Sequence, residues 1–184
     1  DTLPDIVLNS ILGDVVWLKN VGPRSSPRLA APAPVEVAWE GPQPRLAWGW
    51  RVPRGAGLLT QWRTTPVVHD VTGDGLPDLV MLDHEGFLAL FERAQRDGQR
   101  VLLPPRRAFL DAAGVPLRLA TGTAGKSGRR KLCITDWDGD GRFDLLVNSR
   151  NADWLRQVGA DERGWRFDNS GPLAPATIEG HDVS

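Results

Sequence analysis

The chain lacks several features that mark common protein classes. It has no tyrosine and a single cysteine, Cys133, among its 184 residues, so an internal disulfide framework is excluded. No apolar run approaches the roughly 20 residues that a membrane-spanning helix needs, and we expect no membrane span. Basic and acidic residues number 22 and 23. This balance argues against nucleic acid as a partner.

Long stretches with helical periodicity are also absent, whereas 20 glycines and 15 prolines interrupt the sequence frequently. Between them stand short runs rich in Val, Ile, Leu, Phe and Trp, which is typical of strands. We therefore expect an all-β protein. The expected strands are 6–9, 15–19, 66–69, 79–82, 87–91, 132–135, 145–148 and 154–158, with further outer strands at 35–39 and 46–52. Residues 109–112 are expected to form a short helical turn or no regular element.

An aspartate-rich motif occurs three times. Residues 70–82 read DVTGDGLPDLVML and residues 136–148 read DWDGDGRFDLLVN, a separation of 66 residues. The chain opens with DTLPDIVLN, which matches the sequence from Asp74 onward at a separation of 73 residues. These matches divide a single domain, 1–184, into approximate repeats 1–69, 70–135 and 136–184.

These units resemble the repeats of the FG-GAP (or VCBS) family. The resemblance is carried by residues 1–19, 63–92 and 129–158. It implies β-propeller blades of four antiparallel strands, with the strand before each aspartate loop innermost. About three such blades make a partial propeller, because closed propellers usually have four to eight blades. We therefore expect the chain to be a fragment of a larger propeller, with the remaining blades or a second copy of the chain as partner.

The third aspartate loop, DWDGDGRFD, predicts a calcium site. Carboxylates at positions 1, 3, 5 and 9 and the carbonyl at position 7 are the hard oxygen ligands that Ca²⁺ prefers. The expected ligands are Asp136, Asp138, Asp140, Arg142 (through its carbonyl) and Asp144. Gly139 and Gly141 permit the positive φ values that a tight loop needs. The alternative, an ordinary Asp-Gly turn, leaves four neighbouring carboxylates to repel one another.

The second loop has the same spacing but a hydroxyl in place of one carboxylate. Its expected calcium ligands are Asp70, Thr72, Asp74, Leu76 (through its carbonyl) and Asp78. The missing charge predicts weaker binding than in the third loop. The first loop keeps only Asp1 and Asp5 with the Leu3 carbonyl, which is an incomplete site. Calcium is expected to be structural and to fix the hairpin that encloses each loop.

A second group of polar residues is expected at the opposite end of the hairpins from the calcium. Residues equally distant from the second loop face each other across its hairpin, which brings Arg63 opposite the turn 83–86 that contains His84. We expect the equivalent positions of the later repeats to lie beside them. This set, the rim residues, comprises Arg63, His84, Arg129, Arg150, Asn151, His181 and Trp62.

The rim residues suit an acidic polysaccharide. Arginine binds carboxylate or sulfate in a bidentate manner, and tryptophan offers a flat surface to a sugar ring. Propellers of the resembled family occur in secreted lyases similar to ulvan and rhamnogalacturonan lyases. The resemblance therefore implies an extracellular or periplasmic carbohydrate-active protein, although no signal peptide begins the sequence.

The first functional hypothesis is a polysaccharide lyase that cleaves a uronate-containing polymer by β-elimination. His84 is the expected base, Arg63 the neutraliser of the uronate carboxylate and His181 a second proton carrier. Substrate binding is assigned to Arg150, Asn151, Arg129 and Trp62. Two alternatives stay open: a non-catalytic carbohydrate-binding or adhesion propeller, and a partial propeller that completes its ring by self-assembly. In the first of these alternatives the same rim residues bind without catalysis. The non-functional interpretation of His84 itself is an ordinary exposed hairpin residue.

Three other side chains carry expectations about packing. Cys133 lies within the apolar run KLCIT and is expected to be a small buried hydrophobe. Trp137 and Trp154 are expected in the core. His69, directly before Asp70, is expected to support the second loop.

Overall fold

The computed structural model describes residues 3–46, 51–120, 130–148 and 152–173, with the backbone of two short strands beyond them. Within these residues every regular element is a β-strand, and the strands form several small sheets, none of which closes on itself. The expectation of an all-β protein is confirmed. No helix of the described residues is long and apolar enough to cross a membrane.

The first two sheets each contain three antiparallel strands joined in sequence order. The first sheet consists of β1 (Ile6–Asn9), β2 (Val15–Leu18) and β3 (Ala33–Pro34). The second sheet consists of β4 (Val67–His69), β5 (Asp78–Leu82) and β6 (Leu88–Phe91). A separate hairpin of β7 (Arg93–Arg96) and β8 (Gln99–Leu102) follows. The inner strands expected from the sequence are therefore present within a residue or two of the expected bounds.

The third sheet is larger, in the order β10-β11-β12-β13-β9. Its antiparallel strands are β10 (Leu132–Thr135), β11 (Asp144–Asn148), β12 (Ala152–Asp161) and β13 (Gly164–Pro172). The strand β9 (Phe109–Asp111) pairs with β13 in parallel. Two further strands, β14 (Thr177–Ile178) and β15 (His181–Asp182), pair with each other.

Two expectations about the less regular stretches need correction. Residues 109–111 form a strand rather than a helical turn, because Phe109 packs against Trp165 and Phe167 of β13 while its backbone extends the sheet. Residues 35–39 form only isolated bridges, such as Val37 to Leu102. Of the expected strand 46–52, residues 47–50 lie outside the described part, and the rest are not in a strand.

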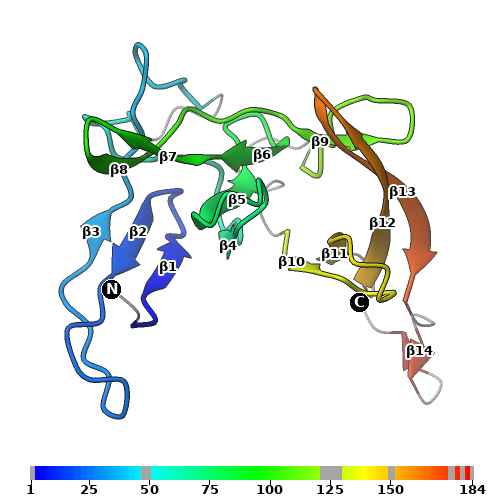
Figure 1. The fold of residues 1–184 in the computed structure, drawn as a ribbon, viewed down its shortest axis with the longest axis horizontal. Coiled ribbons are helices and arrows are strands. Elements are labelled where there is room, and N and C mark those ends of the chain that lie inside the picture. The colour runs from blue at the N-terminus through cyan, green and yellow to red at the C-terminus, as the bar shows by residue number, and fades with distance from the viewer. Residues whose placement is uncertain are drawn as a thin grey trace.

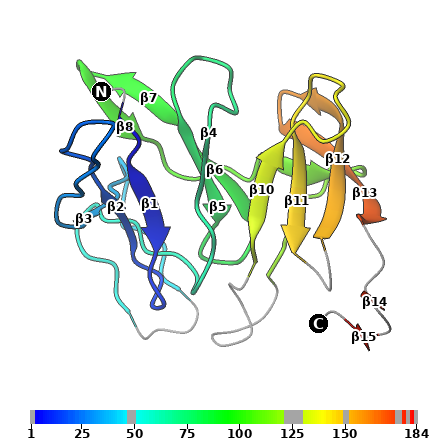
Figure 2. The same cartoon turned by 90° about the horizontal axis from the view of Figure 1, so that it is seen from below.

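The three sheets follow an arc that is open on one side, with β1, β4 and β10 toward its inside (Figure 1). The aspartate loops of the second and third sheets lie at the same end of the sheets (Figure 2). Two clusters of buried side chains hold the arc together, one between the first and second sheets and the other between the second and third. The sheets therefore stack face to face, each on the next.

Candidate metal centre

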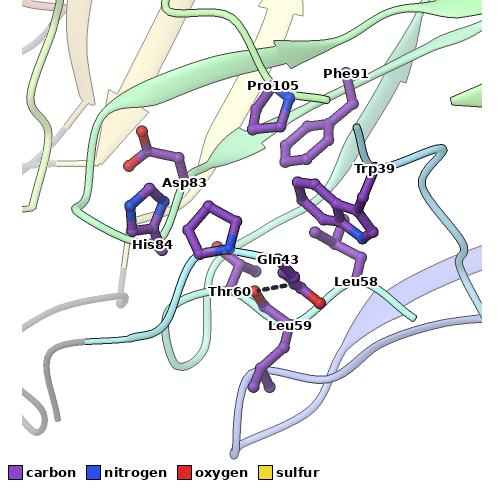
Figure 3. Close-up of a pocket in the computed structure, with 10 residues that line it drawn as sticks. Trp39, Gln43, Leu58, Leu59, Thr60, Asp83, His84, Phe91 and Pro105 are labelled. Carbon is purple, nitrogen blue, oxygen red and sulfur yellow. Dashed lines mark hydrogen bonds between the residues drawn. The ribbon is translucent and has the colours of Figure 1, made fainter. Parts of the chain in front are cut away.

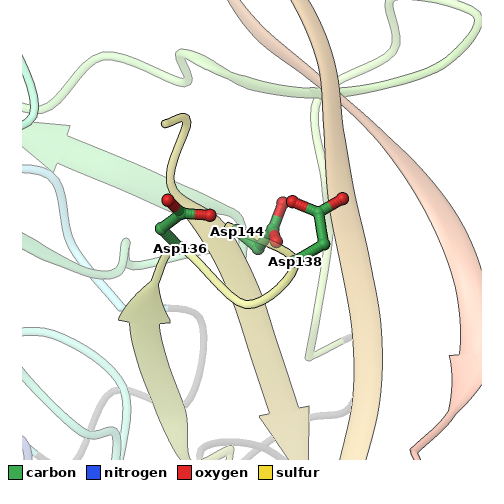
Figure 4. A group of neighbouring side chains, drawn as sticks. All are labelled: Asp136, Asp138 and Asp144. Carbon is green, nitrogen blue, oxygen red and sulfur yellow. The ribbon is translucent and has the colours of Figure 1, made fainter. Parts of the chain in front are cut away.

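Three aspartates of the third loop bring their carboxylates together. Ligand oxygens of Asp136, Asp138 and Asp144 all lie within 4.8 Å of one another, on one side of the bend of the loop (Figure 4). Asp144 is buried and the other two are exposed. Calcium–oxygen distances of roughly 2.3–2.6 Å allow one ion to touch oxygens this far apart. These three residues could therefore hold a single metal ion.

The loop is curled by its first aspartate. Asp136 Oδ1 accepts hydrogen bonds from the backbone N–H groups of Gly139 (2.8 Å) and Asp140 (3.1 Å), and its Oδ2 accepts one from Gly141 (3.0 Å). Gly139 and Gly141 have φ values of 76° and 85°, in the left-handed region, as the motif predicts. The loop geometry expected for a metal-binding turn is thus present in the backbone.

Asp144 joins the loop to the sheet. Its Oδ2 accepts a hydrogen bond from Trp137 N (3.2 Å) and its Oδ1 accepts one from Gln157 N of β12 (2.8 Å). The carboxylate is 1% exposed. Trp137, expected in the core, has half of its side-chain surface exposed (51%), so that expectation is wrong. It lies between residues whose side chains turn into the loop, and its own side chain therefore turns outward.

Asp140, a predicted ligand, lies outside the three-aspartate group because arginines hold it. The hydrogen bond from the Arg142 guanidinium lowers the pKa of Asp140 below its ordinary value. Arg156 on β12 contacts the carboxylates of Asp138 and Asp140, with its Nε 2.7 Å from Asp138 Oδ2 and an Nη 3.5 Å from Asp140 Oδ2. Sequence reasoning missed Arg156, which stands 12 residues beyond the loop in a strand with no motif of its own.

The second loop repeats the same backbone frame. Asp70 accepts hydrogen bonds from Gly73 N (2.8 Å), Asp74 N (3.2 Å) and Gly75 N (2.9 Å), in the same pattern as Asp136. Asp78 is 1% exposed and accepts from the backbone N–H groups of Val71 and Thr72. Among the described residues, however, no group of three acidic, His or Cys ligands forms here.

Thr72 explains this difference between the loops. It occupies the place that Asp138 has in the third loop, and its hydroxyl lies 3.3 Å from Asp78 Oδ2. A neutral donor thus stands where the third loop has a carboxylate. Leu76, the expected carbonyl ligand, donates its N–H to Asp74 Oδ1 at 2.8 Å. Arg142 N donates in the same way to Asp140.

The last aspartate of each loop accepts an equivalent hydrogen bond from a backbone N–H on the segment that follows its hairpin. These backbone bonds are Asn20 N to Asp5 Oδ1 (2.7 Å), Arg93 N to Asp78 Oδ1 (2.8 Å) and Gln157 N to Asp144 Oδ1 (2.8 Å). In the first loop, Asp1 lies outside the described residues and Asp5 is exposed. The three hairpins therefore share one structural position even though their loops differ in acidity.

At the other end of the second hairpin, Arg63 and Thr64 are expected opposite the turn 83–86, and this stays a prediction. The residues just before them, Thr60 and Gln61, do lie against this end of the hairpin. The Thr60 hydroxyl donates to the Leu82 carbonyl, and a Cβ at Gly86 would lie 3.1 Å from Gln61 Nε2. Arg63 is exposed with a φ of 51°, and Trp62 is half-buried.

His84 lies at the edge of a small pocket of about 10 Å³. Figure 3 shows it beside Asp83, with Trp39 and Phe91 at the other end of the pocket. Arg63 does not line this pocket. The space accommodates about one water molecule and is far too small for a sugar ring.

Two arginines that the sequence did not single out hold the turn of His84. Arg107 forms ion pairs with Asp83 (2.7 Å) and Glu85, and its guanidinium stacks 3.8 Å from the centre of the Phe87 ring. Arg118 Nε donates to the Glu85 carbonyl at 3.0 Å. The hydrogen bond from Arg107 lowers the pKa of Glu85 below its ordinary value.

The remaining rim residues are placed only in part. Arg129, Arg150 and Asn151 lie outside the described residues, and His181 is described only as backbone in β15. Their expected clustering with His84 stays a prediction. His69, the expected support of its own loop, lies with its ring 6.0 Å from the ring of Phe143 in the third loop.

A second hollow, of about 890 Å³, lies between the first and second sheets. Its lining includes Trp17 and three basic residues, Lys19, Arg93 and Arg100, together with the acidic residues Asp5, Glu36 and Asp78. Burial and the nearby charge of Arg100 lower the pKa of Arg93. No sequence motif marks this hollow, because its walls come from two different repeats.

Comparison with known proteins identifies no relative of this chain. The chain matches no protein-family model, no curated protein and no solved structure.

Proposed function

We propose that the chain is a calcium-stabilised partial β-propeller built from repeats of the FG-GAP/VCBS type. The convergence of Asp136, Asp138 and Asp144 carries this proposal. The arc of stacked sheets and the shared hydrogen-bond frame of the two complete loops support it.

Calcium fits the donor set better than softer metals do. All the side-chain ligands are carboxylate oxygens, which suit hard cations, and no His or Cys belongs to the group. A bound Ca²⁺ would neutralise the carboxylates and hold the loop closed. Its place at the β10–β11 hairpin, away from the two hollows, fits a structural role.

Thermal unfolding with calcium or with a chelator tests this proposal. A ligand that binds only the folded state raises the melting temperature as its concentration increases. We expect calcium to raise the melting temperature of the wild-type chain and to leave that of Asp136→Asn almost unchanged. Asp161→Asn is the matched control, because Asp161 is an exposed carboxylate paired with Arg166 outside the loop. An equal response of Asp136→Asn and the wild type would contradict the assignment.

Carbohydrate binding is the second part of the proposed function. The 890 Å³ hollow offers Trp17 as an apolar surface, with Arg93 and Arg100 as partners for carboxylate or sulfate groups. Its size falls in the range of ligand pockets, whereas the pocket beside His84 does not. These observations favour a non-catalytic acidic-saccharide module over the lyase.

The lyase remains a testable second candidate, with His84 as base, Arg63 as neutraliser and His181 as a further proton carrier. It rests on the placement of His84 at the edge of a pocket, next to Asp83. Incubation with a panel of uronate-containing polysaccharides in calcium would release unsaturated uronate that absorbs in the ultraviolet. If the polysaccharide binds without any rise in absorbance, and His84→Ala binds it equally well, the protein is a binding module rather than a lyase.

The proposed compartment follows from the same resemblance. Millimolar calcium outside the cytoplasm would fill a site of few protein ligands. We therefore propose an extracellular or periplasmic protein, and localisation of the tagged protein in its host tests this.

A further inference from the structure

The two interfaces between sheets use the same pair of faces. Side chains alternate across a strand, so β5 presents Leu79 and Met81 on one face and Val80 and Leu82 on the other. The front face, which consists of Leu79, Met81, Ala89 and Phe91, packs in the cluster with the first sheet. The back face, which consists of Val80, Leu82, Leu88 and Leu90, packs in the cluster with the third sheet.

The third sheet follows the same rule. Leu145 and Val147 on β11 are equivalent to Leu79 and Met81, and they pack against the back face of the second sheet. All four of these front-face residues are at most 5% exposed. A front face in this chain is therefore covered by the back face of the preceding sheet.

Among the described residues, no sheet covers the apolar front face of the first sheet. The 73-residue offset makes Ile6 equivalent to Leu79 and Leu8 equivalent to Met81. The strand registers agree, because Ile6 pairs with Leu18 as Leu79 pairs with Phe91. Ile6 is 45% exposed and Leu8 is 39% exposed, against 3% and 0% for their equivalents.

The back face of the third sheet is likewise not covered by any described sheet. Leu146 is equivalent to Val80 and Cys133 to Val67, since both pairs face each other across their hairpins. Val80 is completely buried, whereas Leu146 is half-buried and Cys133 is exposed. The expectation that Cys133 is buried is wrong for this reason: it lies on a back face that no described sheet covers.

We infer that a second copy of the chain covers both surfaces. The front face of the first sheet in one copy packs on the back face of the third sheet in the other, and the reciprocal contact closes the pair. Two copies bring six stacked sheets, within the four to eight of closed propellers, and the open arc of Figure 1 leaves room for the second half. This inference rests on the proposed partial propeller. It selects a second copy because the chain itself offers the matching apolar back face.

Sedimentation velocity of the 184-residue chain tests the inference. We expect a dimer, and Leu8→Glu should weaken association by at least about tenfold, because the contact would bury an unpaired charge. Val115→Glu is the matched control, since Val115 is more accessible than Leu8 (56% against 39% exposed) and lies in the turn after β9, on neither face. A wild-type monomer at high concentration, or a dimer unaffected by Leu8→Glu, would overturn the inference.

Cross-linking locates the contact. Cys133 is the only cysteine, so Leu8→Cys adds a single partner thiol on the opposite surface. A short bis-maleimide should join Leu8→Cys chains into covalent dimers, and the additional change Cys133→Ser should abolish them. Val115→Cys should give no such product. Equal cross-linking of Leu8→Cys and Val115→Cys would contradict the proposed faces. These outcomes do not depend on calcium binding to the third loop, which is measured separately by the calcium-dependent melting temperature.

Discussion

Arg156 Nε lies 2.7 Å from Asp138 Oδ2, so a side chain from β12 already neutralises one of the three converging carboxylates of the third loop. A metal ion at this site and the guanidinium would share the Asp138 carboxylate. The converging carboxylates of the loop require a positive charge to offset their repulsion, and Arg156 supplies part of that charge.

Replacing this guanidinium should make the loop more dependent on calcium. Arg156→Met keeps much of the apolar stem but removes the charge, so the loop carboxylates repel one another more strongly when no metal is bound. We expect a lower melting temperature in chelator, tighter calcium binding by calorimetry and a larger increase of the melting temperature on adding calcium.

The matched variant is Arg166→Met. It also breaks an arginine–aspartate pair on the third sheet, with Asp161, but this pair lies outside the loop. It should leave calcium affinity unchanged. A similar gain in affinity from both variants would point to general charge reduction rather than to competition at Asp138.

The second loop should become a metal site through one substitution. Thr72→Asp places a carboxylate where Asp138 stands in the equivalent loop, on a backbone frame that is already the same. We expect one additional bound calcium per chain by calorimetry. The reverse change, Asp138→Thr, should remove the site of the third loop, and no gain in stoichiometry from Thr72→Asp would contradict the equivalence of the two loops.

Asp78 should matter for stability even without metal. Its carboxylate accepts from three backbone N–H groups, those of Val71, Thr72 and Arg93, and it is 1% exposed. Asp78→Asn would turn an amide N–H₂ toward one of these donors, so we expect a loss of about 1.5–3 kcal/mol in the free energy of unfolding, measured by urea in chelator. Asp5→Asn, at the exposed equivalent position, should cost under about 1 kcal/mol. An equal loss of unfolding free energy in Asp78→Asn and Asp5→Asn would mean that burial of the carboxylate does not determine its contribution to stability.

Acid should weaken the turn that holds His84. The pKa of Glu85 is lowered in the folded chain by its hydrogen bond from Arg107. A lowered folded-state pKa contributes stability that is present above the unfolded value of about 4 and is lost as the pH falls through the folded value. We expect the melting temperature to fall below about pH 4, with a smaller fall in Arg107→Met. Identical pH profiles for the two proteins would contradict this role of the pair.

The sequence predicted the inner hairpins and the loop geometry because both depend on local chemistry. The glycines at positions 4 and 6 of the second and third loops have positive φ, and short apolar runs between turn residues define β1, β5 and β10. The positions of Asp144 and Asp78 in the loops could be predicted for the same reason, since the backbone N–H groups that donate to them lie in the same loop or in the segment after the hairpin.

Features that depend on contacts between residues distant in the sequence could not be predicted. β9 looks irregular in sequence, and only its pairing with β13 makes it a strand. Arg156 reaches the third loop from across the sheet, and Arg107 reaches the turn of His84 from 22 residues beyond Glu85. Cys133 is exposed because no described sheet covers its face of β10, and composition does not reveal which faces are covered.

Trp137 allows calcium binding to be measured at the third loop itself. Trp137 is half exposed, and it directly follows Asp136, one of the proposed ligands, in the chain. Terbium, a hard cation that replaces calcium, luminesces when a nearby excited tryptophan transfers energy to it. We expect tryptophan-excited terbium emission from the wild-type chain that calcium displaces, strong loss of emission in Trp137→Phe with binding retained, and no binding at this site in Asp136→Asn. Emission that persists unchanged in Asp136→Asn, or that calcium fails to displace, would contradict the calcium site.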